Sequence, residues 1–238
     1  MGRYSKANNF FEINMIKDFD SKKMMAITEN EAKFLQRTIL NQDADILDVM
    51  CGYGRLGNSL YDLGYHNISG VDMGEFDFIS EQKKFNFYNA DFYNWVSTQV
   101  YDYCYSLYNS YDSYETFLKT IDRCKMMLKE KGILIIDIFN KDWRDRISDT
   151  SYRIVSDEQT EKIELFRFYD GLHEKSIYRI SDNDGIREFS YSQCVITKDK
   201  LLEIIPSDWD ITITDSSIEN TRDDDQKNIL ILRKKVKK

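Results

Sequence analysis

Proline and histidine are scarce in this sequence of 238 residues, which has only Pro206, His66 and His173 of these two types. So little proline leaves no rigid proline-rich spacer between domains. No apolar run approaches the ~20 residues that span a bilayer, and no signal-peptide segment precedes the first polar stretch. We therefore expect a cytoplasmic protein that does not enter a membrane.

Cysteine is also sparse, and the cysteines form no CxxC pair. The four are Cys51, Cys104, Cys124 and Cys194. Their wide spacing indicates neither a zinc site nor a disulfide framework, so we expect buried thiols and no bound metal. The net charge of −8 argues against nucleic acid as a partner, because surfaces that follow nucleic-acid phosphates are basic. A small molecule or a peptide is the expected partner.

Short apolar runs alternate with helical patterns over the first 140 residues. The runs that predict strands are Ile46–Cys51, Ile68–Asp72, Phe85–Tyr88, Tyr101–Leu107 and Ile133–Phe139. A capping box of Thr28 and Glu31 predicts the start of a helix before the first strand. A later helix, capped by Asp112 and Glu115, is expected to end before Gly132. This alternation predicts a parallel sheet with helices on both faces.

The texture changes over residues 150–196, where apolar and polar residues alternate around turn signals at Asp170-Gly171 and Asp184-Gly185. An antiparallel ribbon is expected there. A helix near 198–205 and strands near 209–215 and 228–233 then resume the first pattern. The predicted fold is α/β: a doubly wound, seven-stranded, mostly parallel sheet with a small antiparallel β-lid inserted after strand five.

The segment ILDVMCGYGRLG, residues 46–57, places glycines between the first strand and the next helix. Gly52, Gly54 and Gly57 allow the backbone to approach a ligand and direct helix N-terminal amides toward it. Asp72 follows Gly52 by 20 residues and ends the next strand, where a carboxylate can accept both ribose hydroxyls. A dehydrogenase has the same features, and Asp72 could instead cap the strand end.

Two further carboxylates favour a cationic cofactor over a dinucleotide. Asp48 lies inside the first strand, where a carboxylate suits a cation better than a pyrophosphate. Asp91 follows the third strand and can accept from an adenine amino group while the Phe92 ring packs on the base. The alternative for Asp91 is a helix N-cap. S-adenosylmethionine carries a sulfonium, an ammonium, a ribose and an adenine, so it fits the set.

The run from Asp48 to Arg55 resembles the first motif of the class I S-adenosylmethionine-dependent methyltransferases, and the resemblance covers about residues 40–140. It implies S-adenosylmethionine as cofactor and S-adenosylhomocysteine as product. The cofactor-binding residues that it implies are Asp48, Met50, Cys51, Gly52, Gly54, Asp72, Met73, Asp91, Phe92 and Leu107. Met50 stands where the family commonly has glycine or another small residue, so we expect the loop to be displaced there.

The resemblance also implies three regions. Residues 1–40 form a helical cap over the cofactor site, residues 41–149 and 197–238 form the Rossmann-like domain, and residues 150–196 form the lid. The loop after strand four faces the methyl group in such sheets. Its Asn109-Ser110-Tyr111 stretch has no proline, unlike nucleobase amino-methyltransferases, and resembles small-molecule enzymes of the glycine N-methyltransferase type. We expect Tyr108, Asn109 and Tyr111 to bind a small molecule.

Methyl transfer needs alignment and exclusion of water more than a strong base. A hydroxyl substrate requires a base and a neutral amine does not. Because neither histidine is well placed, we expect transfer to nitrogen rather than oxygen. The candidate catalytic residues are Tyr4, Tyr108, Asn109 and His173, although His173 also fits an exposed turn.

Three other functions stay open at this point. A peptide or protein methyltransferase could use the ribbon as a docking edge. A non-catalytic subunit could keep the fold and bind an active partner enzyme. The third is a nucleotide-dependent oxidoreductase or epimerase. Either a monomer or a homodimer is compatible with the sequence.

Overall fold

The computed structural model describes residues 9–18, 21–74, 83–139, 149–158, 160–214 and 227–235. Its helices and strands are α1 (Phe10–Asp18), α2 (Lys22–Thr38), β1 (Ile46–Val49), α3 (Arg55–Asp62), β2 (Ile68–Asp72), β3 (Asn86–Asn89), β4 (Tyr101–Ser106), α4 (Tyr114–Met127), β5 (Leu128–Phe139), β6 (Thr150–Glu158), β7 (Glu161–Tyr169), β8 (His173–Asp182), β9 (Gly185–Cys194), α6 (Lys198–Ile204), β10 (Trp209–Thr214) and β11 (Lys227–Lys234). None of the described helices is long and apolar enough to cross a membrane.

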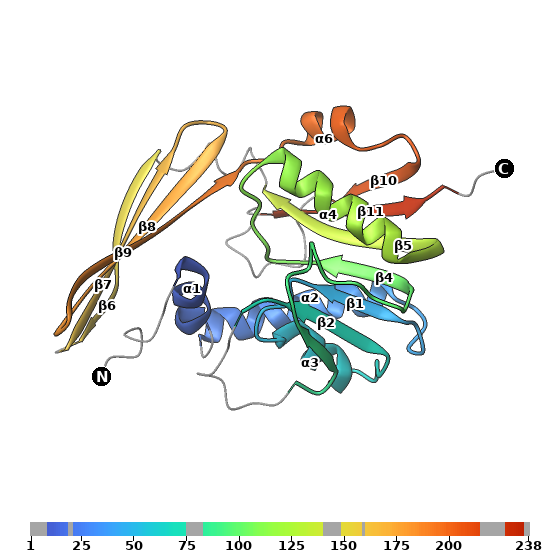
Figure 1. Ribbon diagram of the computed structural model, residues 1–238, viewed down its shortest axis with the longest axis horizontal. Coiled ribbons are helices and arrows are strands. Elements are labelled where there is room, and N and C mark those ends of the chain that lie inside the picture. Colours follow the sequence, from blue (N-terminus) through green and yellow to red (C-terminus); the bar gives the residue numbers. More distant parts are fainter. Residues whose placement is uncertain are drawn as a thin grey trace.

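The strands form a seven-stranded sheet in the order β10-β11-β5-β4-β1-β2-β3 and a separate four-stranded sheet, β6-β7-β8-β9 (Figure 1). Strands β1 to β5 pair in parallel, whereas β11 runs antiparallel to both β5 and β10. The predicted fold is confirmed: a mostly parallel sheet, with an antiparallel sheet inserted after β5. We call the inserted sheet, β6 to β9, the lid sheet.

Helices cover both faces of the large sheet because every residue of the central strand β1 is buried and both faces need apolar partners. One face packs against α4 and α6 through residues that include Phe117, Ile121 and Leu201. The opposite face packs against α2 and α3 through residues that include Leu35 and Leu60. Two apolar cores therefore hold β1 and β4 at the centre of the molecule.

Two predicted helix starts were wrong. Helix α2 begins at Lys22, where the Ser21 hydroxyl accepts the Met24 N–H at 3.0 Å. Thr28 and Glu31 are thus not a capping box. Both lie in the middle of α2, and their side chains are buried. Helix α4 is capped by Ser113 rather than by Asp112, since the Ser113 hydroxyl accepts the Thr116 N–H at 3.1 Å. A serine or threonine one turn away from an acidic residue is common within helices as well as at their starts.

The strand after α4 also begins earlier than predicted. The sequence indicated a helix up to Gly132 and a strand from Ile133. In the structure α4 ends at Met127 and β5 starts at Leu128. The glycine is a strand residue here, and a Cβ on it would lie 2.8 Å from the Leu128 Cβ. Close packing against Leu128, and not a helix stop, accounts for this glycine.

The lid sheet shares a small apolar core with α1, which lies beside it in Figure 1. Ile13 and Ile16 of α1 are buried against a lid face that presents Ile163, Leu165 and Tyr178. The Phe10 ring stacks on Tyr191 with centroids 5.5 Å apart. The predicted turns at Gly171 and Gly185 are confirmed, with φ of 92° and 123°. Helix α1 is therefore a packing partner of the lid sheet.

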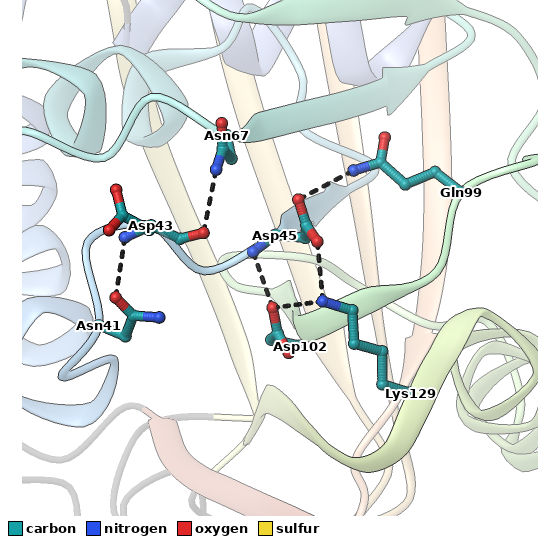
Figure 2. Close-up of polar contacts among 7 residues, drawn as sticks. All are labelled: Asn41, Asp43, Asp45, Asn67, Gln99, Asp102 and Lys129. Atoms are coloured by element: carbon teal, nitrogen blue, oxygen red, sulfur yellow. Dashed lines mark hydrogen bonds and ion pairs between the residues drawn. The ribbon is translucent and has the colours of Figure 1, made fainter.

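A polar network joins the amino ends of the central strands, at the opposite end of the sheet from the glycine loop (Figure 2). The Lys129 Nζ lies 2.8 Å from both the Asp45 and the Asp102 carboxylates. The Asp45 N–H donates to Asp102 at 2.9 Å, and the Gln99 amide donates to Asp45 at 3.2 Å. The hydrogen bond to Asp102 is the largest cause of the raised pKa of Lys129, and the hydrogen bond to Asp45 is the second. One ammonium thus offsets two neighbouring carboxylates where β1, β4 and β5 meet.

We expect Lys129→Met to lower the melting temperature by about 2 to 4 °C, or ~1 kcal/mol. The loss is small because the three side chains are about a third exposed, and solvent screens the pairs. Since the pKa of Lys129 is raised, its contribution is complete at neutral pH and is lost only as the pH rises through that raised value. Lys131→Met, at an exposed position on the same strand, is the control and should leave the melting temperature unchanged in thermal unfolding.

Candidate active site

The glycine loop, residues 50–54, leaves the carboxyl end of β1 with three residues in the left-handed region. Their φ values are 54° for Met50, 56° for Gly52 and 85° for Gly54, which is the N-cap of α3. The Gly54 N–H closes the turn on the Cys51 carbonyl at 3.0 Å. Glycine adopts such angles without strain, whereas a side chain at Met50 costs about 1 to 2 kcal/mol. Met50 takes up this angle although it carries a side chain.

Asp72 ends β2 and is hydrogen-bonded to the glycine loop. Its Oδ2 accepts the Gly52 N–H at 2.7 Å and its Oδ1 accepts the Gly74 N–H at 2.8 Å. Burial raises the pKa of Asp72, and these two N–H groups oppose the rise. Each carboxylate oxygen keeps a further lone pair. The geometry therefore leaves acceptors for a pair of ribose hydroxyls next to the loop.

Asp48 is buried in β1, with a side-chain oxygen, Oδ2, that has no hydrogen-bond partner among the described residues. Burial raises the pKa of Asp48 to about 7, while the neighbouring Tyr105 and Arg55 side chains oppose the rise. Asp48 and Tyr105 are paired in register on β1 and β4. A buried carboxylate oxygen without a hydrogen-bond partner is costly unless a ligand completes it. A cationic group such as an ammonium would do so.

The expected adenine residues lie at the edge beside Asp72. The Ala90 N–H donates to the Asp72 carbonyl at 2.9 Å, so the two segments meet. The Asp91 carboxylate accepts the Tyr93 N–H at 2.9 Å and the Asn94 amide at 2.5 Å, which holds the following turn. The Phe92 ring is buried in the core, and Met73 is 72% exposed. Asp91 therefore caps a turn and not the helix that was its alternative role, and its role toward adenine stays a prediction.

The loop after β4 is held by hydrogen bonds to two neighbouring strands. Tyr108 has a φ of 65°, and its N–H donates to the Asp137 carboxylate of β5 at 2.8 Å. The Asn109 amide donates to the Val49 carbonyl of β1 at 3.2 Å and to the Ser106 hydroxyl at 2.8 Å. Asn109 therefore fixes the loop against the end of β1, directly before the glycine loop.

The remaining residues of this loop differ in exposure. Leu107 is buried in the core beside α2 and α3. Tyr111 is also buried, with its hydroxyl 3.0 Å from the Ser106 Oγ, and burial raises its pKa well above the usual range. The Tyr108 side chain is 42% exposed. Of the three residues expected to bind substrate, Tyr108 is the most accessible.

The lid sheet joins this loop at its base. The Cys194 N–H donates to the Tyr111 carbonyl at 2.7 Å, and the Tyr191 hydroxyl donates to the Ser110 carbonyl at 3.2 Å. His173 begins β8 with its side chain 52% exposed and its Nδ1 3.7 Å from the Asp170 carboxylate. Tyr4 lies outside the described residues. The structure thus brings the lid sheet to the loop that was expected to face the methyl group.

Several residues of this region were not assigned from the sequence. Arg55, inside the quoted motif, pairs with Glu31 at 2.6 Å and donates to Thr28 at 2.9 Å. The two residues of the apparent capping box therefore anchor Arg55, the first residue of α3 after the glycine loop. Asp137 could have been found, because it is a carboxylate inside the apolar run of β5, which is the same signal that singled out Asp48.

No family model matches the chain, and no curated protein sequence does. Solved structures do match. The CcbJ methyltransferase of Streptomyces caelestis is 16% identical with a TM-score of 0.69, over 87% of this chain and 89% of its own. An S-adenosylmethionine-dependent methyltransferase of Clostridium acetobutylicum is 14% identical with a TM-score of 0.68, over 93% and 96%. The sugar N-methyltransferase KedS8 of a Streptoalloteichus species is 15% identical with a TM-score of 0.64, over 99% and 97%. The chain therefore has the fold of S-adenosylmethionine-dependent methyltransferases.

Proposed function

We propose that the protein is an S-adenosylmethionine-dependent methyltransferase that methylates the amine of a small molecule. The observation that carries the proposal is the unpaired, buried carboxylate oxygen of Asp48 beside the glycine loop. Asp48 would accept the cofactor ammonium, the glycine loop would pack against its amino-acid part, and Asp72 would accept the ribose hydroxyls. When bound, the cofactor supplies an activated methyl group on a cationic sulfur.

Transfer to nitrogen suits the side chains around the loop after β4. Burial raises the pKa of Tyr105 and of Tyr111, so neither phenol ionises readily. The Asn109 amide is engaged with backbone and hydroxyl acceptors. An amine that enters in its neutral form already has its lone pair available and needs orientation rather than a base. Tyr108 and the lid sheet would orient the amine and exclude water.

The inner face of the lid sheet supports a hydroxylated substrate. Near the loop after β4, this face carries four polar side chains, which we call the lid polar group: Arg167, Glu174, Ser176 and Gln193. The Gln193 amide donates to the Glu174 carboxylate at 3.1 Å. The Gln193 Oε1 and the Arg167 Nε are buried without a hydrogen-bond partner among the described residues. Together they offer a donor and an acceptor for hydroxyl groups.

An amino sugar combines hydroxyls with an amine. The structural neighbours include the sugar N-methyltransferase KedS8 and the amino pentose methyltransferase CalS10. We therefore propose an amino sugar, or a similar hydroxylated amine, as the substrate class. The cofactor chemistry and the substrate class are separate parts of this proposal and need separate tests.

Calorimetry with S-adenosylhomocysteine tests the cofactor, and radiolabelled methyl transfer to a panel of amino sugars tests the substrate. Matched sugars with hydroxyl in place of the amine are the control and should take up no label. Absence of heat and of thermal shift with both cofactor and product would refute the proposal. Label that goes to macromolecules in a lysate but to no small amine would favour the peptide or protein methyltransferase instead.

A further inference from the structure

Backbone strain in the described residues is concentrated beside the candidate site. Met50 and Tyr108 are the two non-glycine residues with positive φ in that part of the chain. Each follows the carboxyl end of one of two neighbouring parallel strands, β1 and β4. A non-glycine residue keeps such an angle only where its surroundings enforce it. The contacts that enforce the angle at Tyr108 are therefore informative.

Two side chains hold Tyr108 from opposite directions. On the sheet side, its N–H donates to the carboxylate of Asp137, a fully buried residue of β5. On the other side, the Arg55 Cζ lies 5.3 Å from the centroid of the Tyr108 ring, within the range of a cation–π contact. The backbone of Tyr108 is thus held from β5 and its ring from the start of α3.

Arg55 is itself held by α2. Its Nη2 lies 2.6 Å from the Glu31 carboxylate, which is 1% exposed, and its Nη1 donates to the Thr28 hydroxyl at 2.9 Å. The planar guanidinium contacts both acceptors at once, which a lysine ammonium reproduces less well. A continuous set of contacts therefore runs from α2 through Arg55 to the Tyr108 ring.

We infer that Arg55 and Asp137 are positioning residues that hold Tyr108 in place, Arg55 through the ring and Asp137 through the backbone N–H. The inference rests on the proposed function for its purpose, which is a fixed aromatic wall beside the reacting groups. It concerns the contacts that Arg55 and Asp137 make with Tyr108. Its structural part can be tested without any ligand.

The first test compares Tyr108→Gly with Tyr108→Ala, since both remove the ring and differ only in tolerance of positive φ. We expect the glycine variant to melt about 2 to 4 °C higher. The control pair is Val96→Gly and Val96→Ala at an exposed loop residue with negative φ, where glycine should melt lower. A Tyr108→Gly variant that melts below Tyr108→Ala would overturn the inference.

The second test is a double-mutant cycle of Arg55→Met and Tyr108→Leu in a Glu31→Gln background, which avoids leaving a buried carboxylate without its partner. We expect each single change to lower the melting temperature by about 3 to 6 °C. The decrease in the double variant should be smaller than the sum of the two single decreases by at least ~2 °C. Additive shifts would contradict coupling through Arg55. The same cycle in kcat should also be non-additive.

The two proposals fail in different ways. If the protein binds neither S-adenosylmethionine nor S-adenosylhomocysteine, the proposed function fails, while both melting-temperature tests still decide the positioning role. If cofactor binding is normal and the cycle is additive, the positioning role fails alone. Lys84→Met, at an exposed ion pair with Asp62 of α3, is the control for nonspecific loss of charge and should leave kcat unchanged.

Discussion

Replacing Asp48 with asparagine is expected to stabilise the protein at alkaline pH while it weakens binding of the cofactor. The pKa of Asp48 is about 7 in the folded protein, against ~3.9 in an unfolded chain. The folded state therefore holds the proton more tightly, and the ionised form costs stability that grows as the pH rises from ~4 to ~7. Between pH 5 and pH 8 the free energy of unfolding of the variant should therefore rise by about 2 to 3 kcal/mol relative to that of the original protein.

Thermal unfolding at pH 5 and pH 8 measures this gain, which corresponds to about 5 to 10 °C. Asp122→Asn, at an exposed carboxylate on α4, is the matched control and should show the same difference at both pH values. A pH-independent effect of Asp48→Asn would mean that the buried carboxylate does not titrate in this range.

The same group should link cofactor binding to pH. A cation bound at Asp48 favours its ionised form, so affinity for S-adenosylmethionine should rise as the pH passes through ~7, with release of a proton. Calorimetry in two buffers of different ionisation enthalpy measures that proton. Asp48→Asn should abolish the release and weaken affinity at least ~10-fold, because an amide offers no charge to the ammonium.

Asp72→Ala is expected to cause the largest loss of cofactor affinity, about 100-fold or more. The substitution removes the proposed acceptors for two ribose hydroxyls and frees the Gly52 and Gly74 N–H groups that Asp72 now holds. Each hydrogen bond to a charged acceptor contributes ~1.5 to 3 kcal/mol. Asp72→Asn keeps one carbonyl acceptor, so its loss of cofactor affinity should be about tenfold smaller than that of Asp72→Ala.

Calorimetry with S-adenosylhomocysteine checks both variants, and Asp91→Ala serves as the comparison. If Asp91 only holds its turn, the alanine variant should lose stability and keep its affinity. If it also contacts adenine, affinity should fall about tenfold. An Asp72→Ala protein that is folded and binds as tightly as the original would remove Asp72 from the site.

The fold was predictable because it depends on patterns that the sequence displays directly. Apolar runs such as Ile46 to Val49 are buried on both faces and read as strands of a parallel sheet. The turn residues Gly171 and Gly185 predicted the hairpins of the lid sheet. Helix starts were less predictable, because Ser21 and Ser113 compete with several polar neighbours and only the backbone angles decide between them.

The candidate site was predictable where one residue type has few alternative roles. A carboxylate in an apolar strand, as at Asp48, needs a special reason in any fold. The role of Arg55 was hidden because its partners on α2 lie more than 20 positions away and have the spacing of a helix cap. Tyr111 was predicted to bind substrate from its neighbours in the sequence. Its ring packs edge-on against Phe117 with centroids 5.2 Å apart, and a role toward substrate stays a prediction.

The shared core of α1 and the lid sheet has a consequence for biosynthesis. Ile13 and Ile163 pack in one cluster although they are 150 positions apart. At ~5 to 20 residues per second, α1 leaves the ribosome roughly 8 to 30 s before the strands that cover it. During that interval the sheet strands β1 to β5 can pair, but the apolar side of α1 has no partner. Nascent chains that stop before residue 150 should therefore bind chaperones through α1 more strongly than completed ones.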